Sequence, residues 1–513
     1  MIVEDQAEIV AFLSDPGSHG GVGPVETMET HISRIFLVGD RAYKMKRAVK
    51  LPYVDFSTPD RRLEACRREV EFNGATTPEL YLGVRAITRR ADGGLALDGG
   101  GALVEAVVEM ARFGQDALFD RMALAGQLTP DLMTETARMI VRFHRAAPIV
   151  HTGGGADNIA GVLDINEAAF ASSQVFDAGA VAALNRAFRE ALARHAALLD
   201  RREAAGKVRR CHGDLHLRNI VLIDGAPRLF DCIEFNDAIA TIDTLYDLAF
   251  LLMDLWHRGF DAFANRVMNR YLDEADDEDG FPLLPFFMAV RAAVRAHVTA
   301  TRIDEGSDPD GRLAAEAHSY LDLAGRLLRE RPARLIAIGG LSGTGKTTVA
   351  EALAPRLGTP PGARIVESDR VRKAMHGVPA ETHLPPKAYT PETSERVYAE
   401  MAWRAGLILS EGGTVVADAV FDRPPDRERI AAVATMRSVP FLGVWLEADP
   451  ALLWERVRDR TGGPSDATVD VLSRQLARKV GDIDWNRLDA AGSTDAIVAS
   501  ILALAGEACR DES

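Results

Sequence analysis

The chain has 513 residues, of which 47% are hydrophobic and 26% charged, as in ordinary water-soluble proteins of about three domains or lobes. Its formal net charge of −15 excludes a surface built to coat nucleic acid, because phosphate backbones attract an excess of lysine and arginine. Widely spaced cysteines without a CxxC pair, no signal peptide and no apolar run of ~18 residues predict a cytoplasmic protein without a membrane segment.

Residues 1 to about 110 are expected to form a small strand-rich lobe. Two stretches, 35–38 and 42–46, flank a Gly-Asp turn and predict an antiparallel hairpin. A charged helix over about 60–73 and further strands follow it. The first lobe is therefore predicted to be a sheet with one prominent helix.

Two lysines on the second strand of this lobe are candidate phosphate ligands. Lys44 and Lys46 share one strand face, and Glu69 lies on the following helix. A strand lysine paired with a helix glutamate orients nucleotide phosphates in kinases. The alternative is an ordinary surface ion pair, which would contribute little to stability. Either lysine would serve, and Lys44 is preferred because Ala42, two residues earlier, leaves room beside an adenine ring.

Residues 111 to about 328 are predicted to be a larger, mostly helical lobe. Its acidic run at 273–279 is expected to be a solvated loop. Only residues 208–236 interrupt the helices, with short strands and loops. The expected helices include 130–146, 165–203, 243–257 and 283–303.

The interrupting segment contains a second group of candidate residues. Asp214, Asn219 and Asp231 follow the spacing of kinase catalytic machinery, with the last residue just past a strand. Asp214 would accept the proton of an attacking hydroxyl, and Asn219 and Asp231 would bind Mg²⁺, which prefers such oxygen ligands. A polar loop that arose by chance is the alternative.

A charged, proline-containing stretch at 326–334 predicts a domain boundary. Beyond it, alternating strands and helices predict an α/β domain over 334–513, with a parallel sheet covered by helices. Residues 495–499 are either a weak fifth strand or a helix. The four clear strands are expected at 334–339, 363–368, 414–420 and 440–446.

The first of these strands leads into a complete Walker A phosphate loop, with a chance glycine-rich turn as the alternative. Lys346 would reach the β- and γ-phosphates, and the Thr347 hydroxyl would bind Mg²⁺. Backbone N–H groups and the start of the next helix would surround the phosphates. The residues assigned to nucleotide binding are Gly340, Ser342, Gly343, Thr344, Gly345, Lys346, Thr347 and Thr348.

Charged residues follow the later strands of this domain. Asp369 would take a proton from an acceptor hydroxyl, while Arg372, one helical turn on, would hold a substrate phosphate. Asp418 ends another strand and would hold Mg²⁺ through water. Arg456 is the favoured lid arginine for the transferring phosphate, although a solvated helix residue is the alternative.

The N-terminal part, residues 1 to about 328, resembles the aminoglycoside phosphotransferase family of small-molecule kinases through the motifs HGDLHLRN, LFDCIEFND and DTLYDLA. The resemblance implies a bilobal protein-kinase-like fold, a base at Asp214 and metal ligands at Asn219 and Asp231. It also implies a nucleotide against the linker that contains Met110. His212 and Asp247 would support the catalytic loop. The family's GxGxxG loop is missing before Lys44, as in other members without that signature.

The C-terminal part, residues 333–513, resembles the P-loop kinases that include polynucleotide, gluconate and zeta-toxin kinases, through the motifs GLSGTGKTT, SDRVR and VVADAVF. The combined architecture is similar to bacterial proteins described as bifunctional aminoglycoside phosphotransferase/ATP-binding proteins. The resemblance implies ATP and Mg²⁺ as cofactors. It identifies neither acceptor.

Together these patterns predict a kinase with two nucleotide sites that phosphorylates a small-molecule hydroxyl in the first domain and a second acceptor in the P-loop domain. Catalysis would consist of positioning and charge neutralisation, without a covalent protein intermediate. One alternative is a single kinase with a regulatory P-loop domain, and another is an ATPase whose acceptor is water. Nucleic-acid and membrane partners are not expected, and the oligomeric state is open.

Overall fold

The computed structural model describes residues 3–21, 23–51, 54–304, 306, 308, 310–459, 462–478 and 480–506. The chain packs into two compact units: unit 1 comprises residues 1–155 and 201–251, and unit 2 comprises residues 156–200 and 252–513. The predicted division near 328–334 falls within unit 2 and stays a prediction. Cys66, Cys211 and Cys232 are buried free thiols, whereas Cys509 lies outside the described residues.

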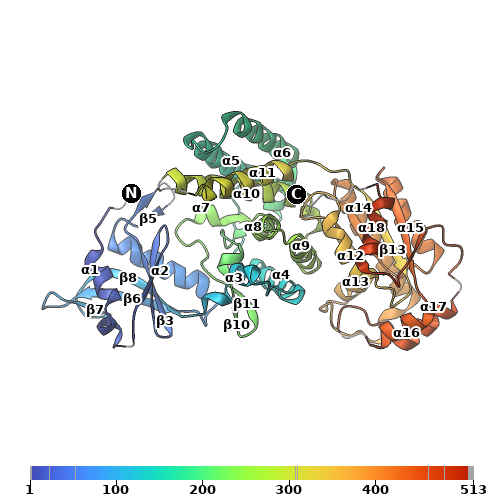
Figure 1. Cartoon of the computed structure of the whole chain (residues 1–513), viewed down its shortest axis with the longest axis horizontal. Coiled ribbons are helices and arrows are strands. Elements are labelled where there is room, and N and C mark those ends of the chain that lie inside the picture. Colours follow the sequence, from blue (N-terminus) through green and yellow to red (C-terminus); the bar gives the residue numbers. More distant parts are fainter. Residues whose placement is uncertain are drawn as a thin grey trace. The chain divides into compact units, whose positions relative to one another are not determined.

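Unit 1 is built on a six-stranded antiparallel sheet with the order β1-β2-β3-β8-β6-β7. The predicted hairpin and helix are confirmed as β2, β3 and α2, and α2 packs against β6 and β8 (Figure 1). Thr58 caps α2 and Pro59 begins it, which are favoured choices at those positions. The strands are β1 (Glu26–Glu29), β2 (Ser33–Val38), β3 (Arg41–Lys46), β6 (Tyr81–Arg89), β7 (Leu95–Leu97) and β8 (Ala102–Ala111), and α2 is Pro59–Gly74.

The remaining elements of unit 1 include the short strands β9 (Val208–Arg210), β10 (Ile220–Ile223) and β11 (Ala226–Leu229), which carry the catalytic-loop motif between them. Strand β10 pairs with β11, and β9 pairs with β12. The other elements are α1 (Ala7–Ser14), β4 (Lys50–Leu51), β5 (Val54–Asp55), α3 (Phe119–Leu124), α4 (Pro130–Ala146), α7 (Asp237–Ala240), β12 (Thr241–Asp243) and the start of α8 (Thr244–His257).

The helices of unit 2 correct one of the sequence-based expectations. The single helix expected at 165–203 is two helices, because Asp177 Oδ1 accepts from Ala180 N–H at 2.8 Å and caps a new helix start. Helices α9 and α11 lie in the part of the chain that was expected to be mostly helical. These elements are α5 (Gly155–Ser172), α6 (Ala178–Ala204), α9 (Asp261–Ala275), α10 (Leu283–Asp304) and α11 (Arg312–Leu327).

Among the described residues, one helix is long and apolar enough to cross a membrane. It is α10, whose apolar span is Leu283–Ile303, and 72% of that helix's most apolar window is buried inside the protein. A buried apolar helix of this kind is what a large soluble core also contains. Helix α10 packs along α11.

The P-loop part of unit 2 is a five-stranded parallel sheet with the order β14-β15-β13-β16-β17. All four clear strands are confirmed, residues 495–499 belong to a helix, and β17 was not expected. Helices α12 and α18 cover one face, and α14 and α15 lie against the sheet as well (Figure 1). The strands are β13 (Leu335–Gly340), β14 (Arg364–Glu367), β15 (Val415–Asp418), β16 (Phe441–Glu447) and β17 (Asn486–Asp489); the helices are α12 (Lys346–Leu353), α13 (Ser368–Met375), α14 (Pro391–Ser410), α15 (Pro424–Met436), α16 (Pro450–Arg458), α17 (Val469–Ala477) and α18 (Thr494–Leu504).

The acidic run at 273–279 is not a solvated loop. Glu278 is only 4% exposed and accepts from Arg364 at 2.7 and 3.0 Å, and Asp273 lies 2.8 Å from the same guanidinium. Burial opposes the charge on Arg364, but Glu278 and Asp273 outweigh that cost and raise its pKa. The expectation failed because these partners lie about 90 residues apart in the sequence.

The edge strand β14 and the residues just before it are also hydrogen-bonded to side chains of α9. Asn269 Oδ1 accepts from Ile365 N–H at 2.7 Å, and Asn265 Nδ2 donates to the carbonyls of Pro361 and Ala363 at 2.9 and 3.1 Å. An edge strand otherwise presents unpaired backbone groups. Helix α9 therefore satisfies part of the P-loop sheet's open edge.

We expect Arg364→Ala to lower the free energy of unfolding of unit 2 by about 3–5 kcal/mol, because it removes the cation that donates to both oxygens of Glu278 and leaves that buried carboxylate with Arg404 alone, at 3.1 Å. Urea unfolding followed by circular dichroism measures this loss. The matched control is Arg312→Ala, since the exposed Arg312–Asp310 pair is worth about 0–1 kcal/mol. Equal small losses in both variants would contradict the role given to Arg364.

Candidate active sites

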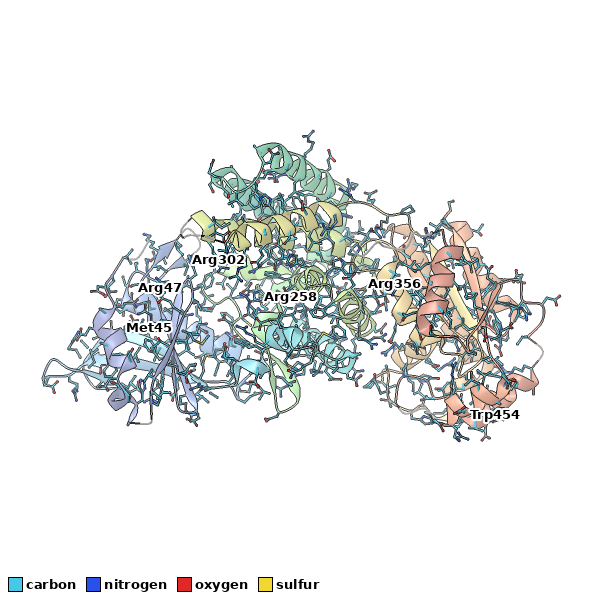
Figure 2. The ribbon with its side chains drawn as sticks, viewed as in Figure 1. Met45, Arg47, Arg258, Arg302, Arg356 and Trp454 are labelled. Atoms are coloured by element: carbon cyan, nitrogen blue, oxygen red, sulfur yellow. The ribbon has the colours of Figure 1, made fainter. Side chains whose placement is uncertain are left out.

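Strand β3 presents its two lysines to α2 and to the loop after β11. Met45, labelled in Figure 2, is buried on the opposite face of the sheet with Phe36 and Ile87, so Lys44 and Lys46 point the other way. Lys44 Nζ donates to Glu69 Oε1 at 2.7 Å and also pairs with Asp231. One lysine thus connects the sheet, the helix and the loop.

Lys46 has different partners. Its Nζ lies 2.5 Å from Glu69 Oε2 and pairs with Glu234, and both Lys46 and Glu234 are buried. Burial alone would raise the pKa of Glu69, but the two lysines lower it to about 2. Lys46 therefore balances buried carboxylates, while Lys44 lies beside the candidate metal ligand Asp231.

The catalytic-loop residues lie together. Asn219 Nδ2 donates to Asp214 Oδ2 at 3.0 Å and to the Asp214 carbonyl at 2.9 Å, so Oδ1 is the side-chain atom of Asn219 that could bind a metal ion. His216 Nδ1 accepts from Arg218 N–H, so its Nε2–H faces Asp214 Oδ2 at 3.3 Å. Sequence reasoning missed His216, although it lies inside the motif.

Two hydrogen bonds to the backbone of Phe230 join this loop to the segment that carries Asp231. Phe230 N–H donates to the Asn219 carbonyl at 3.2 Å, and His212 Nε2 donates to the Phe230 carbonyl at 2.9 Å. Burial lowers the pKa of His212, which keeps its ring neutral. Asp247 accepts from the N–H groups of His212 and Gly213 at 3.1 and 2.9 Å. His212 and Asp247 thus lie where supports of the loop are expected.

Asp231 has a left-handed backbone, with φ of +62°, which is costly for a residue other than glycine. Its N–H donates to the Tyr81 hydroxyl at 3.0 Å, and Cys232 N–H donates to Asn73 Oδ1 at 2.8 Å. The Thr77 hydroxyl donates to the Leu229 carbonyl at 2.6 Å. The end of α2 and the residues after it therefore hold this strained loop.

Met110 lies inside strand β8, opposite Ala42 of β3 and Tyr81 of β6. The segment 108–110 is thus paired strand, and the chain leaves the sheet only after Ala111. The room expected beside Ala42 is therefore bordered by a buried methionine that is 7% exposed.

The Walker A residues form one loop at the start of α12. Gly340, Gly343 and Gly345 have positive φ angles of 143°, 89° and 82°, and a Cβ at Gly343 would lie 2.9 Å from the Leu453 carbonyl. Ser342 N–H donates to Gln475 Oε1 at 2.9 Å, and Thr344 Oγ1 donates to the Leu341 carbonyl at 2.9 Å. Lys346 Nζ reaches the same carbonyl at 3.1 Å, and Thr348 is exposed in the first turn of α12.

Two carboxylates lie beside this loop. Thr347 Oγ1 donates to Asp418 Oδ2 at 2.6 Å, which brings the two predicted Mg²⁺ residues together. Glu367 is paired in register with Asp418 on the neighbouring strand and is 4% exposed. Burial raises the pKa of Asp418 to about 6, and burial with Asp418 raises that of Glu367. Sequence reasoning missed Glu367, although it ends a strand two residues before Asp369.

The candidate acceptor residues lie on α13. Burial raises the pKa of Asp369, although the Ser465 hydroxyl, Arg372 and Lys346 oppose this shift. The Arg372 guanidinium lies 4.8 Å from the centre of the Tyr389 ring and donates to the Ala388 carbonyl at 2.9 Å. Its Nε is buried without a hydrogen-bond partner among the described residues.

Arg456 contacts backbone rather than carboxylates. Its guanidinium donates to the Ala490 carbonyl at 3.0 Å and to the Gly343 carbonyl at 3.4 Å. The lid arginine expected from sequence thus lies against the Walker A loop itself. It joins α16 to that loop.

Two family models match this chain in sequence. Residues 39–284 match the phosphotransferase enzyme family, and residues 335–479 match an AAA domain. An uncharacterized protein of Mycobacterium tuberculosis (strain H37Rv) is 30% identical over 483 residues, which cover 91% of this chain and 93% of that protein. The shikimate kinase of Ruegeria pomeroyi is 30% identical over 139 residues, covering 27% of this chain and 63% of the kinase.

Solved structures with similar parts include two kinases. A choline/ethanolamine kinase family protein from Mesorhizobium loti is 14% identical with a TM-score of 0.40. The match covers 62% of this chain and 93% of that protein's chain. A gluconokinase from Sinorhizobium meliloti is 24% identical with a TM-score of 0.25, and covers 34% of this chain and 92% of its own. The two family matches, with a shikimate kinase among the relatives, support a kinase with two kinase-like domains.

The two lysines of β3 are predicted to differ in function. Lys44→Met should lower kcat/KM of the first reaction by about 10²–10³-fold, because it removes the cation beside Asp231. Lys46→Met should cost less than about tenfold in kcat/KM but destabilise unit 1 by about 3–5 kcal/mol, because Glu69 and Glu234 lose a buried partner.

Steady-state kinetics and thermal unfolding of both folded variants measure this difference. A Lys46→Met protein that stays as stable as wild type but loses more turnover than Lys44→Met would contradict the assignment.

Proposed function

This chain belongs to the family that joins a phosphotransferase enzyme domain to a C-terminal AAA domain, and we propose that it is an ATP- and Mg²⁺-dependent kinase with two active sites. The observation that carries the proposal is that Lys44 pairs with both Glu69 and Asp231, in the same unit as the hydrogen-bonded Asp214–Asn219 pair. The Thr347–Asp418 pair beside a Walker A loop carries it for the second site.

In the first site, the acceptor is proposed to be the hydroxyl of a small molecule. The Asp214 carboxylate accepts the hydroxyl proton as the acceptor oxygen bonds to the γ-phosphorus. The bond between that phosphorus and the bridging oxygen breaks, and ADP leaves. Bound Mg–ATP supplies the transferred phosphoryl group and the cation that neutralises its charge. His216 and Asn219 orient Asp214, since each lies within 3.3 Å of its Oδ2.

The donor sets fit Mg²⁺ in both sites. Asp231 and the amide oxygen of Asn219 are hard oxygen ligands, as are the Thr347 hydroxyl and Asp418. In the second site, Asp369 is proposed to accept the proton of a second acceptor, and Lys346 to hold the phosphates. The raised pKa of Asp369 moves it closer to the range in which a carboxylate exchanges protons.

Small-molecule acceptors are the proposed partners, and the cytoplasm is the proposed compartment, where free thiols such as Cys66 stay reduced. Burial raises the pKa of the Cys66 thiol to about 12, so that this thiol is unreactive. The proposal names a hydroxyl as acceptor chemistry in each site and leaves the molecule open.

The test is a metabolite extract incubated with γ-labelled ATP and each of three proteins: wild type, Asp214→Asn and Asp369→Asn. Wild type should label two acceptors. Each variant should lose one product by about 10²-fold or more, because a positioned general base contributes about 10²–10⁴-fold. Asp131→Asn, an exposed change on α4, should keep both products.

Three outcomes would contradict the proposal. Labelling by Asp214→Asn that equals wild type for every product would remove the first site. Lys346→Ala with both products intact would show that the P-loop domain is not a kinase. Release of labelled phosphate alone would indicate an ATPase.

A further inference from the structure

Unit 1 contains a cavity of about 630 Å³ that the proposed chemistry does not use. It is bordered by α2 and the turn after it, by the end of α4, and by residues of β9 and β11. None of Lys44, Asp214 or Asn219 lines it. Its volume is in the range of about 300–1,000 Å³ that is typical of small-molecule sites.

The inner surface of the cavity is largely apolar. Phe72 of α2, Met139 and Phe143 of α4, and Leu229 of β11 contribute to it. Arg210 lies over the Phe72 ring at 4.3 Å, so one wall combines an aromatic face with a guanidinium. Such a lining accepts an apolar body with a polar end.

The charged residues of the lining include one cation without an ion-pair partner among the described residues. They are three arginines and two glutamates. Arg228 is held by Glu79 at 2.5 Å, and Arg210 by Asp237 at 3.1 Å. Arg142 and Glu71 make no ion pair within the part of the chain that the structure describes, and both are exposed at the cavity. An anionic ligand would give Arg142 a partner.

The cavity wall is continuous with the segment that carries Asp231. Leu229 and Cys232, on either side of that residue, both line the cavity. The same two residues are hydrogen-bonded to α2 and the turn after it, Cys232 N–H to Asn73 in the last turn of the helix and the Leu229 carbonyl to Thr77 just beyond it. Helix α2 also carries Glu69, the partner of Lys44. A ligand in the cavity would therefore touch both supports of the first nucleotide site.

We propose that this cavity is a regulatory site for a small amphipathic anion, an apolar or aromatic molecule with one carboxylate, sulfonate or phosphate group held by Arg142. Its occupancy is coupled to Mg–ATP binding through the Leu229–Cys232 segment and α2. The coupling is reciprocal, so that nucleotide in the first site changes the affinity of the cavity for its ligand.

The probe for binding is 8-anilino-1-naphthalenesulfonate, an aromatic anion whose fluorescence rises in apolar surroundings. Wild type should bind it at one saturable site. Arg142→Gln should raise its Kd about tenfold through loss of the charged hydrogen bond. Ala146→Trp, which places an indole at the cavity from the end of α4, should abolish binding.

Arg67→Gln is the matched control, because it removes the same charge from an exposed position that does not line the cavity. Circular dichroism and thermal unfolding establish that each variant is folded. Unchanged affinity in both Arg142→Gln and Ala146→Trp would overturn the site. This test needs no phosphoryl transfer, so its failure is separate from failure of the proposed kinase reactions.

Coupling is tested in the Lys346→Ala background, so that Mg–ATP reports on the first site. Saturating Mg–ATP should change the probe's Kd about fivefold or more while the probe still binds. Adding Asp231→Asn should remove this change. An unchanged Kd would overturn the regulatory role, and simple competition between probe and nucleotide would place the probe in the nucleotide site instead.

Discussion

Lys44 is a cation with little access to water, and taking a charge out of water costs several kcal/mol unless opposite charges replace the water. Glu69 and Asp231 replace it, the first from α2 and the second from the loop after β11. Burial opposes the charge on Lys44, but Asp231 and Glu69 raise its pKa well above the usual value. Lys44 therefore holds the sheet, the helix and the strained loop together. The loop is joined to Asp214 through Asn219, whose carbonyl accepts from Phe230 N–H and whose side chain donates to Asp214.

In unit 2, too, charges with little access to water are paired with opposite charges. Arg266 and Arg270 of α9 pair with Glu351 of α12 at 2.7 and 3.4 Å, and α12 begins with Lys346, the predicted phosphate ligand. Arg364 on the edge strand is neutralised by Asp273 in the last turn of α9 and by Glu278 just after that helix. The P-loop sheet is thus completed by a helix that precedes it in the chain by some 60 residues.

Local patterns explain what could be predicted from sequence. The Walker A loop, the four parallel strands and the 214–231 motif depend on neighbouring residues, and the structure has them at the expected places. The acidic run was mistaken for a loop because Arg364 lies far along the chain, and Glu367 acquires its neighbour Asp418 only through strand pairing. Likewise, the choice between Lys44 and Lys46 needed their partners, since both share one strand face and one glutamate.

Two magnesium–triphosphate sites in one chain are the central claim, and binding stoichiometry tests it without knowledge of either acceptor. Isothermal titration calorimetry with a non-hydrolysable ATP analogue and Mg²⁺ should give two nucleotides per chain. Lys346→Ala should lose the P-loop site and Lys44→Met the first site, so each variant should bind one nucleotide per chain. A wild-type stoichiometry of one would contradict the claim.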